Sequence, residues 1–271
     1  MEYLFNEWGS VKDKIRNKCL LLLLDYDGTL APIREVPHKA LISEEVRKLL
    51  KKLSEDTSSR VVVISGRALN DIKEKVNLKN IVYVGNHGLE VEGPKIKFEA
   101  PVSRRYKTIL QDIKSDLTKK FSAVKGILLE DKGLSVSLHY RLVDEGSIPK
   151  VNAIFHEAVT AHVIKNRIKV RSGKMVFEVR PPLEWDKGKI VLWLLARQRF
   201  VKGEPAVLPV YLGDDLTDED AFKALEDRGI TIFVGKSKHS YARYYLKDTE
   251  EVKELLGRIL ELEEEKELCP N

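Results

Sequence analysis

The chain has 271 residues, of which 43% are hydrophobic and 33% charged, values that are typical of a globular protein. Its 47 basic and 42 acidic residues are interspersed and leave a net charge of +5, which argues against a nucleic-acid-binding stripe and predicts no nucleic-acid partner. No apolar run is long enough to span a membrane, and residues 1–10 lack the features of a signal peptide, so we expect a cytoplasmic protein without a membrane partner.

The first hundred residues predict alternating helices and strands. Short segments with helical spacing of apolar residues are expected at 10–18, 43–53 and 68–76. Apolar runs that read as strands buried on both faces are expected at 20–24, 60–64 and 81–84. Strands of this kind alternating with helices predict a parallel sheet with right-handed crossovers.

The pattern changes near Ala100-Pro101. Helices are expected at 103–121 and 149–164, and strands at 126–130, 134–140, 168–171 and 175–179. Residues 134–141 alternate strictly between apolar and polar side chains, which is typical of an antiparallel sheet with one face half-exposed. We therefore predict that residues 102–182 form a small α+β domain inserted into the larger one.

After Pro181-Pro182 the first pattern resumes. Helices are expected at 187–200, 218–227 and 250–266, and strands at 207–212 and 230–234. The predicted fold class is therefore α/β, a doubly wound parallel-sheet, Rossmann-like core formed by residues 1–101 and 183–271, with the smaller domain inserted between them.

Polar clusters follow four of the predicted strands. They are Asp25 with Asp27, Ser65-Gly66-Arg67, Asn86-His87, and Asp214-Asp215. Because parallel strands end at one edge of a sheet, these clusters are expected to converge on one crevice. Carboxylates from two strands suit Mg²⁺, one carboxylate can attack an electrophile while another moves protons, and backbone N–H groups after Ser65 can bind phosphate oxygens. Lys187 can add positive charge there.

The string Asp25-Tyr26-Asp27-Gly28-Thr29 resembles the nucleophile motif of the haloacid dehalogenase superfamily, and the other clusters follow in the order of that family. The resemblance implies Asp25 as the nucleophile, Asp27 as the general acid and base, and Lys187 as the phosphate-clamping lysine. It also implies phosphate or substrate binding by Ser65, Gly66, Arg67, Asn86 and His87. The implied magnesium ligands are Asp25, Asp27, Asp214 and Asp215, and the sequence leaves open which of Asp215 and Asp218 ligates the ion directly.

A narrower resemblance covers residues 25–33, 64–67, 85–90 and 213–222, which are similar to motifs of the trehalose-6-phosphate phosphatase family. It implies Mg²⁺-dependent hydrolysis of trehalose 6-phosphate through an aspartyl phosphate. It further implies that the insert is a hinged cap that reads the sugar. The cap residues that would bind the sugar phosphate are Glu130, Lys132, Arg141 and Glu178.

Three alternatives stay open at this point. Related capped phosphatases act on sucrose phosphate, mannosylglycerate phosphate or other sugar phosphates. Degenerate phosphatase domains serve as non-catalytic partners of a synthase, and association with a separate trehalose-6-phosphate synthase is compatible with an active enzyme as well. A phosphotransferase or mutase would pass the phosphoryl group to a second sugar instead of to water.

Overall fold

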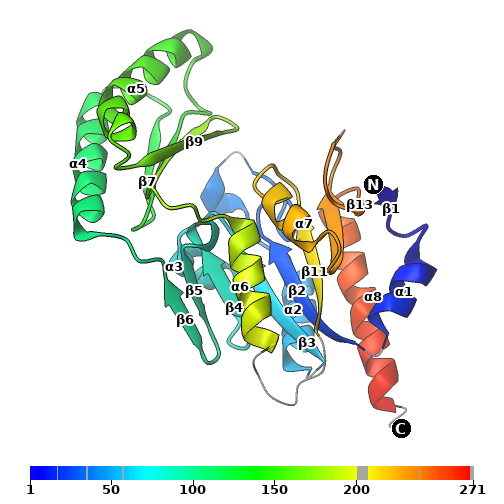
Figure 1. Ribbon diagram of the computed structural model, residues 1–271. Helices are drawn as coiled ribbons and strands as arrows, with labels where there is room; N and C mark the ends of the chain where they lie inside the picture. Colours follow the sequence, from blue (N-terminus) through cyan, green and yellow to red (C-terminus); the bar gives the residue numbers. More distant parts are fainter. Residues whose placement is uncertain (17, 35, 57, 200–206, 238, 269–271) are drawn as a thin grey trace. The chain divides into compact units, whose positions relative to one another are not determined.

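The protein is described by a computed structural model covering residues 1–16, 18–34, 36–56, 58–199, 207–237 and 239–268 (Figure 1). The chain forms two compact units. The first, called the core unit below, comprises Met1–Phe98 and Trp185–Asn271. The second, called the insert, comprises Glu99–Glu184 and contains the predicted range 102–182.

The core unit is built on a nine-stranded sheet. In sheet order its strands are β1 (Glu2–Tyr3), β13 (Tyr244–Leu246), β12 (Ile230–Val234), β11 (Val207–Gly213), β2 (Cys19–Asp25), β3 (Ser59–Ile64), β4 (Val82–Gly85), β5 (Glu90–Gly93) and β6 (Ile96–Glu99). Neighbours from β1 to β4 pair in parallel, and β4 pairs with β5 in antiparallel fashion. The predicted parallel sheet is confirmed, with an antiparallel hairpin added at one edge.

Strand β2 lies in the interior of this sheet because its five leucines supply both apolar faces. Leu20, Leu22 and Leu24 belong to one hydrophobic cluster, whereas Leu21 and Leu23 belong to a second. All five are at most 1% exposed. Burial on both faces is what a continuous apolar run predicts for a parallel strand covered by helices on either side.

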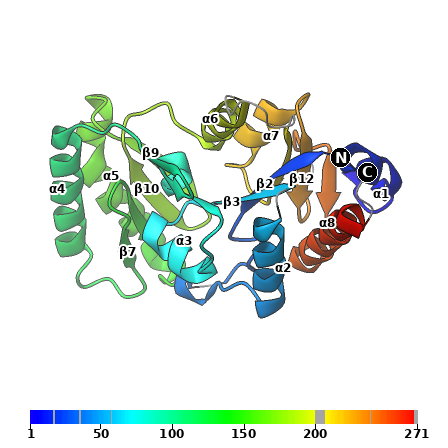
Figure 2. The same cartoon turned by 90° about the horizontal axis from the view of Figure 1, so that it is seen from below.

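Helices cover both faces of the sheet. They are α1 (Trp8–Ile15), α2 (Glu44–Glu55), α3 (Leu69–Val76), α6 (Lys187–Arg199), α7 (Glu219–Leu225) and α8 (Thr249–Leu268). Buried residues of α1, α2, α3 and α8 share one hydrophobic cluster and those of α6 and α7 the other, and Figure 2 shows α2 and α8 on the opposite side of the strands from α6 and α7. A three-layer α/β sandwich follows from this distribution.

The insert has its own core. Its four strands, β7 (Leu128–Asp131), β8 (Val136–His139), β10 (Val176–Arg180) and β9 (Lys169–Gly173), form an antiparallel sheet in that order. Helices α4 (Arg104–Lys120) and α5 (Ile148–Ile164) belong to the same unit (Figure 1). Their residues Leu110 and Phe155 share a hydrophobic cluster with Val136 and Phe177 of this sheet. Short 3₁₀ turns η1 (Pro37–Lys39), η2 (Asn86–Gly88) and η3 (Glu145–Ser147) complete the elements.

Four strands were not expected from the sequence. Strands β1 and β13 have two and three residues, too few for a periodic signal. The hairpin β5–β6 does alternate, with Val91, Ile96 and Phe98 facing inward, and turns at Lys95 with a φ of 59°. That alternation was the overlooked signal.

Two further differences concern single segments. The polar face of residues 134–141 was expected to be half-exposed, but Ser135 and Ser137 are each 1% exposed. Ser137 lies between Glu130 and Glu178 on the adjacent strands, and the Ser135 hydroxyl donates to Glu178. The end of the predicted helix 187–200 falls on residues outside the described ranges, as do the last three residues of the chain. Within the described residues, none of the helices combines the length and the apolarity that crossing a membrane requires.

Candidate active site

The strand order of the core sheet indicates where along its edge a ligand is expected to bind. Strand β2 pairs with β3 on one side and with β11 on the other, so the winding of the sheet reverses at β2. Open α/β sheets bind ligands outside the carboxyl ends of their strands at such a reversal. Asp25 ends β2, and Asp214 directly follows the end of β11.

Asp25 is buried, with 5% of its surface exposed. Its Oδ1 accepts a hydrogen bond from Lys187 Nζ at 2.6 Å. Its Oδ2 is buried and has no hydrogen-bond partner within the described residues. Burial raises the pKa of Asp25 well above its usual value, and the attraction of Lys187 opposes that effect. One oxygen of this carboxylate is therefore held in place, while for the other no donor is found among the described residues.

Lys187 is the first residue of α6 and is 3% exposed. Its ammonium group donates to Asp25 Oδ1 and, at 2.7 Å, to Asp218 Oδ1. Burial lowers the pKa of Lys187, but the charges of Asp218 and Asp25 outweigh burial and raise that pKa well above its ordinary value. The group therefore remains a cation at the centre of the site.

Asp218 orders the loop after β11. Its Oδ1 accepts from Lys187 Nζ and from the hydroxyl of Tyr211, each at 2.7 Å. Its Oδ2 accepts from the backbone N–H groups of Asp214 and Asp215 at 3.1 Å. A carboxylate that accepts from four donors is largely satisfied. Asp218 therefore orients the lysine and the loop.

The acids of this edge also form a candidate metal site. Carboxylate oxygens of Asp25, Asp214 and Asp218 lie within 4.8 Å of one another. Gly28, with a φ of 92°, makes this arrangement possible because a β-carbon there would overlap the Asp214 carboxylate. The donor set is entirely carboxylate oxygen, which suits a hard divalent cation. The residues present fit such an ion.

Asp215 follows Asp214 in the loop after β11. Its Oδ1 accepts from the backbone N–H and the hydroxyl of Thr217, both at 2.7 Å. Desolvation raises the pKa of Asp215, but attraction to Lys187 and the bonds from Thr217 outweigh it and lower the pKa to about 2. The group is therefore ionised across the physiological range.

Asp27 is held apart from the other acids by Arg67. The Arg67 guanidinium donates from Nε at 2.7 Å and from Nη2 at 2.6 Å to the two Asp27 oxygens, and from Nη1 at 2.9 Å to Asp71. Its plane also lies over the Tyr26 ring at 5.4 Å. Burial lowers the pKa of Arg67, yet its hydrogen bonds to Asp27 and Asp71 raise that pKa overall. The fork fixes the direction of Asp27, and phosphate binding by Arg67 stays a prediction from the sequence.

The strand ends of β3 and β4 lie against each other. The backbone N–H of His87 donates to the Ser65 carbonyl at 3.0 Å, and that of Asn86 to the Arg67 carbonyl at 2.7 Å. The His87 ring packs on Gly66, where a β-carbon would overlap it. Ser65 is 1% exposed and its hydroxyl accepts from the Arg67 N–H at 3.1 Å. The predicted Ser65–Arg67 and Asn86–His87 clusters thus form one continuous surface.

The insert holds a second polar cluster. Lys132 Nζ donates to Glu178 at 3.1 Å, the Ser135 hydroxyl donates to the same oxygen at 3.2 Å, and Arg180 pairs with the other Glu178 oxygen. The Glu130 carboxylate lies 2.9 Å from His139 Nε2.

Register places these groups on one face of the insert sheet. Glu130 and Glu178 are both Cα partners of Ser137, on either side of β8. Arg141 lies beyond the end of that strand, where it is exposed and donates to the Lys174 carbonyl at 3.2 Å.

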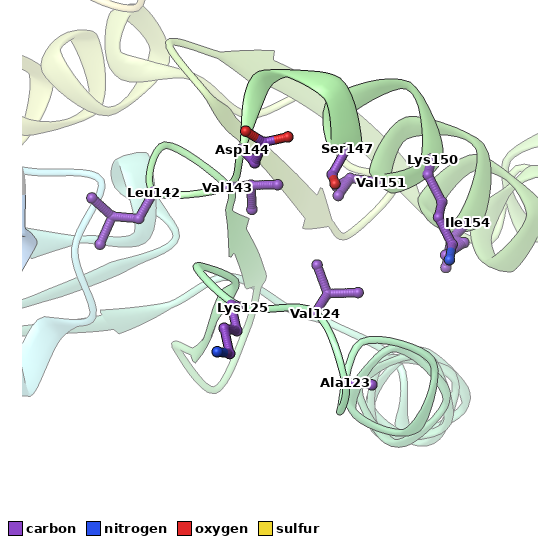
Figure 3. Close-up of a pocket in the computed structure, with 10 residues that line it drawn as sticks. All are labelled: Ala123, Val124, Lys125, Leu142, Val143, Asp144, Ser147, Lys150, Val151 and Ile154. Atoms are coloured by element: carbon purple, nitrogen blue, oxygen red, sulfur yellow. The ribbon is translucent and has the colours of Figure 1, made fainter.

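A separate hollow of about 360 Å³ lies elsewhere in the insert (Figure 3). Val124, Leu142 and Val151 are among its lining residues, together with Lys125 and Lys150. None of the predicted site residues lines it.

Several residues of these clusters were missed by sequence reasoning. They are Tyr211, Asp71, Ser135 and Arg180. Asp71 lies four residues after Arg67 at the start of α3, a spacing that predicts ion pairs on helices. Tyr211 carried no signal, because a tyrosine inside an apolar strand is indistinguishable from a packing residue.

Comparison with known proteins places the chain in a family. The family profile described as trehalose-phosphatase matches residues 23–250. Trehalose-phosphate phosphatase B of Arabidopsis thaliana is 32% identical over 270 residues, which cover 94% of this chain and 70% of that protein. Trehalose 6-phosphate phosphatase RA3 of Zea mays is 33% identical, with coverage of 90% and 70%.

Solved structures agree with this placement. The C-terminal domain of the C. albicans trehalose-6-phosphate phosphatase superimposes with a TM-score of 0.78 at 28% identity, covering 96% of this chain and 99% of that domain. A haloacid dehalogenase-like hydrolase of Bacteroides thetaiotaomicron superimposes with a TM-score of 0.64 at 17% identity, covering 89% and 100%, which supports the fold alone. Since the profile spans most of the chain and its relatives exceed 30% identity, this chain belongs to the trehalose-phosphatase family, on the haloacid dehalogenase fold.

Proposed function

We propose that the chain hydrolyses trehalose 6-phosphate to trehalose and inorganic phosphate. The observation that carries this proposal is the buried Asp25 carboxylate, with one oxygen fixed by Lys187 and the other without a donor in the described part of the chain. A nucleophilic carboxylate needs this combination of a fixed direction and an available lone pair. Membership of the trehalose-phosphatase family supports the substrate.

The metal of the proposed reaction is Mg²⁺. Asp25 and Asp214 would hold it, with Asp215 beside them, and the loop that carries the two latter acids is fixed by Asp218. When bound, such an ion neutralises phosphoryl oxygens and reduces the repulsion between them and an attacking carboxylate.

The proposed reaction has two steps, and residues of this chain act in each of them. In the first, the available Asp25 oxygen attacks phosphorus, the bond from phosphorus to the sugar oxygen breaks, and Asp27 gives its proton to that oxygen. In the second, Asp27 takes a proton from water, which attacks the aspartyl phosphate and releases phosphate and the free Asp25 carboxylate. Lys187 stabilises the negative charge that develops in both steps.

Arg67 keeps the two acids in separate roles. Its bidentate bonds turn the Asp27 carboxylate toward the guanidinium, while Asp25 is bonded to Lys187. A group that must give and then take a proton at a defined atom benefits from a fixed direction. We propose that this fork, with Asp71 behind it, stabilises the ionised form of Asp27, which takes the proton from water in the second step.

The sugar is proposed to be recognised by the insert. Glu130, Lys132 and Glu178 present charged groups on one face of its sheet, with Arg141 beyond the strand end. Groups with several donors or acceptors suit a ligand rich in hydroxyls, and they reject analogues that leave them unpaired.

A panel of sugar phosphates tests the substrate. Phosphate release from trehalose 6-phosphate, sucrose 6-phosphate, mannosylglycerate phosphate and glucose 6-phosphate is measured with Mg²⁺ present. The proposal expects the highest kcat/KM for trehalose 6-phosphate. A higher value for another sugar phosphate would transfer the function to that substrate, and label moving to a second sugar instead of to water would indicate a phosphotransferase.

Chelation tests the metal. Activity should be lost in excess EDTA and restored by added Mg²⁺, and Asp214→Asn should raise the Mg²⁺ concentration needed for half-maximal activity. Full activity in EDTA would overturn the assignment of the ion.

We also propose a cytoplasmic location and an association with a separate trehalose-6-phosphate synthase. A cytoplasmic location is supported by the composition, and cell fractionation with a specific antibody tests it. Association with a separate trehalose-6-phosphate synthase is supported only by the family resemblance. Co-elution of the two purified proteins in gel filtration tests it, and separate elution at micromolar concentrations would contradict it.

A further inference from the structure

The Asn86–Gly88 turn at the end of β4 adopts a backbone conformation that is rarely seen outside glycine. Asn86 and His87 have φ values of 49° and 55°, and Gly88 follows at 104°. Consecutive non-glycine residues in the left-handed region are costly and persist only where surrounding contacts hold them. The contacts that hold this turn therefore matter for whatever the turn does.

One of those contacts comes from a distant tryptophan. Trp185 Nε1 donates to the carbonyl oxygen of Gly88 at 2.5 Å, across a separation of 97 residues. The other side of the turn is bonded to the end of β3, where the N–H of His87 donates to the Ser65 carbonyl and the His87 ring rests on Gly66. The turn is thus held between the tryptophan and the Ser65–Gly66 segment.

Trp185 is itself fixed within the core unit. Its ring stacks on Phe98 at a centroid distance of 5.5 Å and an angle of 26°, and Phe98 in turn lies 5.1 Å from Trp193 of α6. Lys187 begins α6 two residues after Trp185. The rings of Phe98 and Trp193 therefore anchor the Trp185 indole beside the helix that carries the buried lysine.

We propose that Trp185 is a positioning residue, which holds the Asn86–Gly88 turn against the Ser65–Gly66 segment so that this segment can bind the phosphate group. The inference rests on the proposed function, since that function assigns the Ser65 segment to phosphate. Loss of the indole N–H frees the strained turn on one side, and the His87 ring and Gly66 then lose their fixed spacing.

The test compares two tryptophans of the same aromatic cluster. Trp185→Phe keeps an aromatic ring but removes the donor, whereas Trp193→Phe removes an indole for which no hydrogen bond is found in the described part of the chain. Inhibition by inorganic phosphate and turnover of p-nitrophenyl phosphate are measured with Mg²⁺, well below the melting temperatures. We expect Trp185→Phe to weaken phosphate inhibition and raise KM by about five- to tenfold, with kcat changed less, as the loss of one buried hydrogen bond implies. Trp193→Phe should change either value less than about twofold.

Failure of the positioning role of Trp185 can be distinguished from failure of the proposed phosphatase function. Equal effects of the two substitutions, or an unchanged phosphate affinity in Trp185→Phe, would overturn the positioning role alone. A wild-type protein that releases no phosphate from any ester would overturn the proposed function and this inference with it.

A second measurement avoids any folding defect of Trp185→Phe. The double variant Trp8→Phe/Trp193→Phe leaves Trp185 as the single tryptophan of the chain. Saturating inorganic phosphate should shift or quench its emission, because the phosphate-binding segment and the indole contact the same turn. Unchanged emission at a phosphate concentration that inhibits the double variant would contradict the proposal.

Discussion

The two polar clusters of the molecule are assembled in different ways. The core cluster draws Asp25 from the end of β2, Lys187 from the start of α6, and Tyr211 and Asp218 from β11 and the loop after it, and each of these residues is at most 5% exposed. The insert cluster is made by direct neighbours on adjacent strands, such as Glu130 and Glu178 beside Ser137. The topology of a large sheet places the first cluster, and the register of a small sheet places the second.

This difference predicts a division of labour. Groups that are buried and bonded in fixed directions suit a reaction step shared by all phosphate esters. Groups on a sheet face, whose partners are side chains of the same face, suit recognition of one particular alcohol. Substitutions in the two clusters should therefore differ in whether their effect depends on the substrate.

The largest effect is expected from Asp25→Asn. An amide of nearly the same shape cannot form the aspartyl phosphate, so activity should fall by about 10³-fold or more with every phosphate ester. Steady-state phosphate release from trehalose 6-phosphate and p-nitrophenyl phosphate measures it, and circular dichroism controls for folding. Activity retained within tenfold would indicate a different nucleophile.

Asp218→Asn should come next. The amide cannot accept from both Lys187 and Tyr211 while also accepting from the loop N–H groups, and the buried ammonium loses one of its two anionic partners. We expect kcat to fall by about 10²-fold with both substrates and the melting temperature to fall as well. A normal kcat with only the Mg²⁺ dependence altered would instead make Asp218 a direct ligand.

Glu178→Gln tests the insert. The amide loses the ion pairs with Lys132 and Arg180, so KM for trehalose 6-phosphate should rise by about tenfold. The KM for p-nitrophenyl phosphate, which carries no sugar, should stay within about twofold of the wild-type KM. Equal losses with both substrates would contradict the division between the two clusters.

Tyr211→Phe should have a smaller effect that does not depend on the substrate. The substitution removes one hydroxyl from Asp218 and leaves the ring packed, so we expect a loss of about 1 kcal/mol in stability and a decrease of a few-fold in kcat. Thermal unfolding and parallel assays with both esters measure it. A decrease in kcat that is seen only with trehalose 6-phosphate would contradict this role of Tyr211.

The smallest effect concerns an ion pair of the insert. Partial burial raises the pKa of Asp131, but the hydrogen bond from Lys114 at 2.7 Å outweighs it and lowers that pKa overall. A lowered folded pKa contributes stability above the unfolded value of about 3.9, and this contribution is lost as the pH falls through the folded pKa. Lys114→Ala should therefore cost less than about 1 kcal/mol at pH 7, because the pair is partly exposed.

Comparison at two pH values isolates that contribution. The difference in unfolding free energy between wild type and Lys114→Ala should shrink when the pH is lowered from 7 to 3. Lys119→Ala on the same helix is the control, and it should show no such change. A difference that stays constant with pH would mean that the lysine acts through packing instead.

The sequence predicted where the residues of the core site lie better than it predicted which of them are hydrogen-bonded to each other. Buried strands ending in Asp25 and Asp214 fix where these residues lie, since parallel strands share an edge. Nothing in the sequence distinguishes Arg67 bonded to Asp27 from Arg67 bonded to phosphate, because both interactions use the same guanidinium fork. Tyr211 was hidden for a similar reason, since its ring satisfies the apolar pattern of β11 while its hydroxyl serves Asp218.

The insert was predicted in outline and less well in detail. Alternation along residues 134–141 gave its antiparallel character, but an alternating strand reports faces and not the depth of burial. Ser137 lies between Glu130 and Glu178, and the Ser135 hydroxyl donates to Glu178, contacts that depend on a register between strands that no single segment encodes.

The stacking of Phe98 on Trp185 has an evolutionary consequence. These residues are the last before the insert and the first after it, and their rings are 5.5 Å apart, so 86 intervening residues leave and rejoin the core at almost one point. Closing so narrow a gap would take only a short glycine-rich bridge, and the entropic cost of a loop rises slowly with its length. An ancestral enzyme could gain, lose or trade this whole module, and with it the identity of the alcohol it releases, while leaving every strand of the nucleophile-bearing sheet untouched.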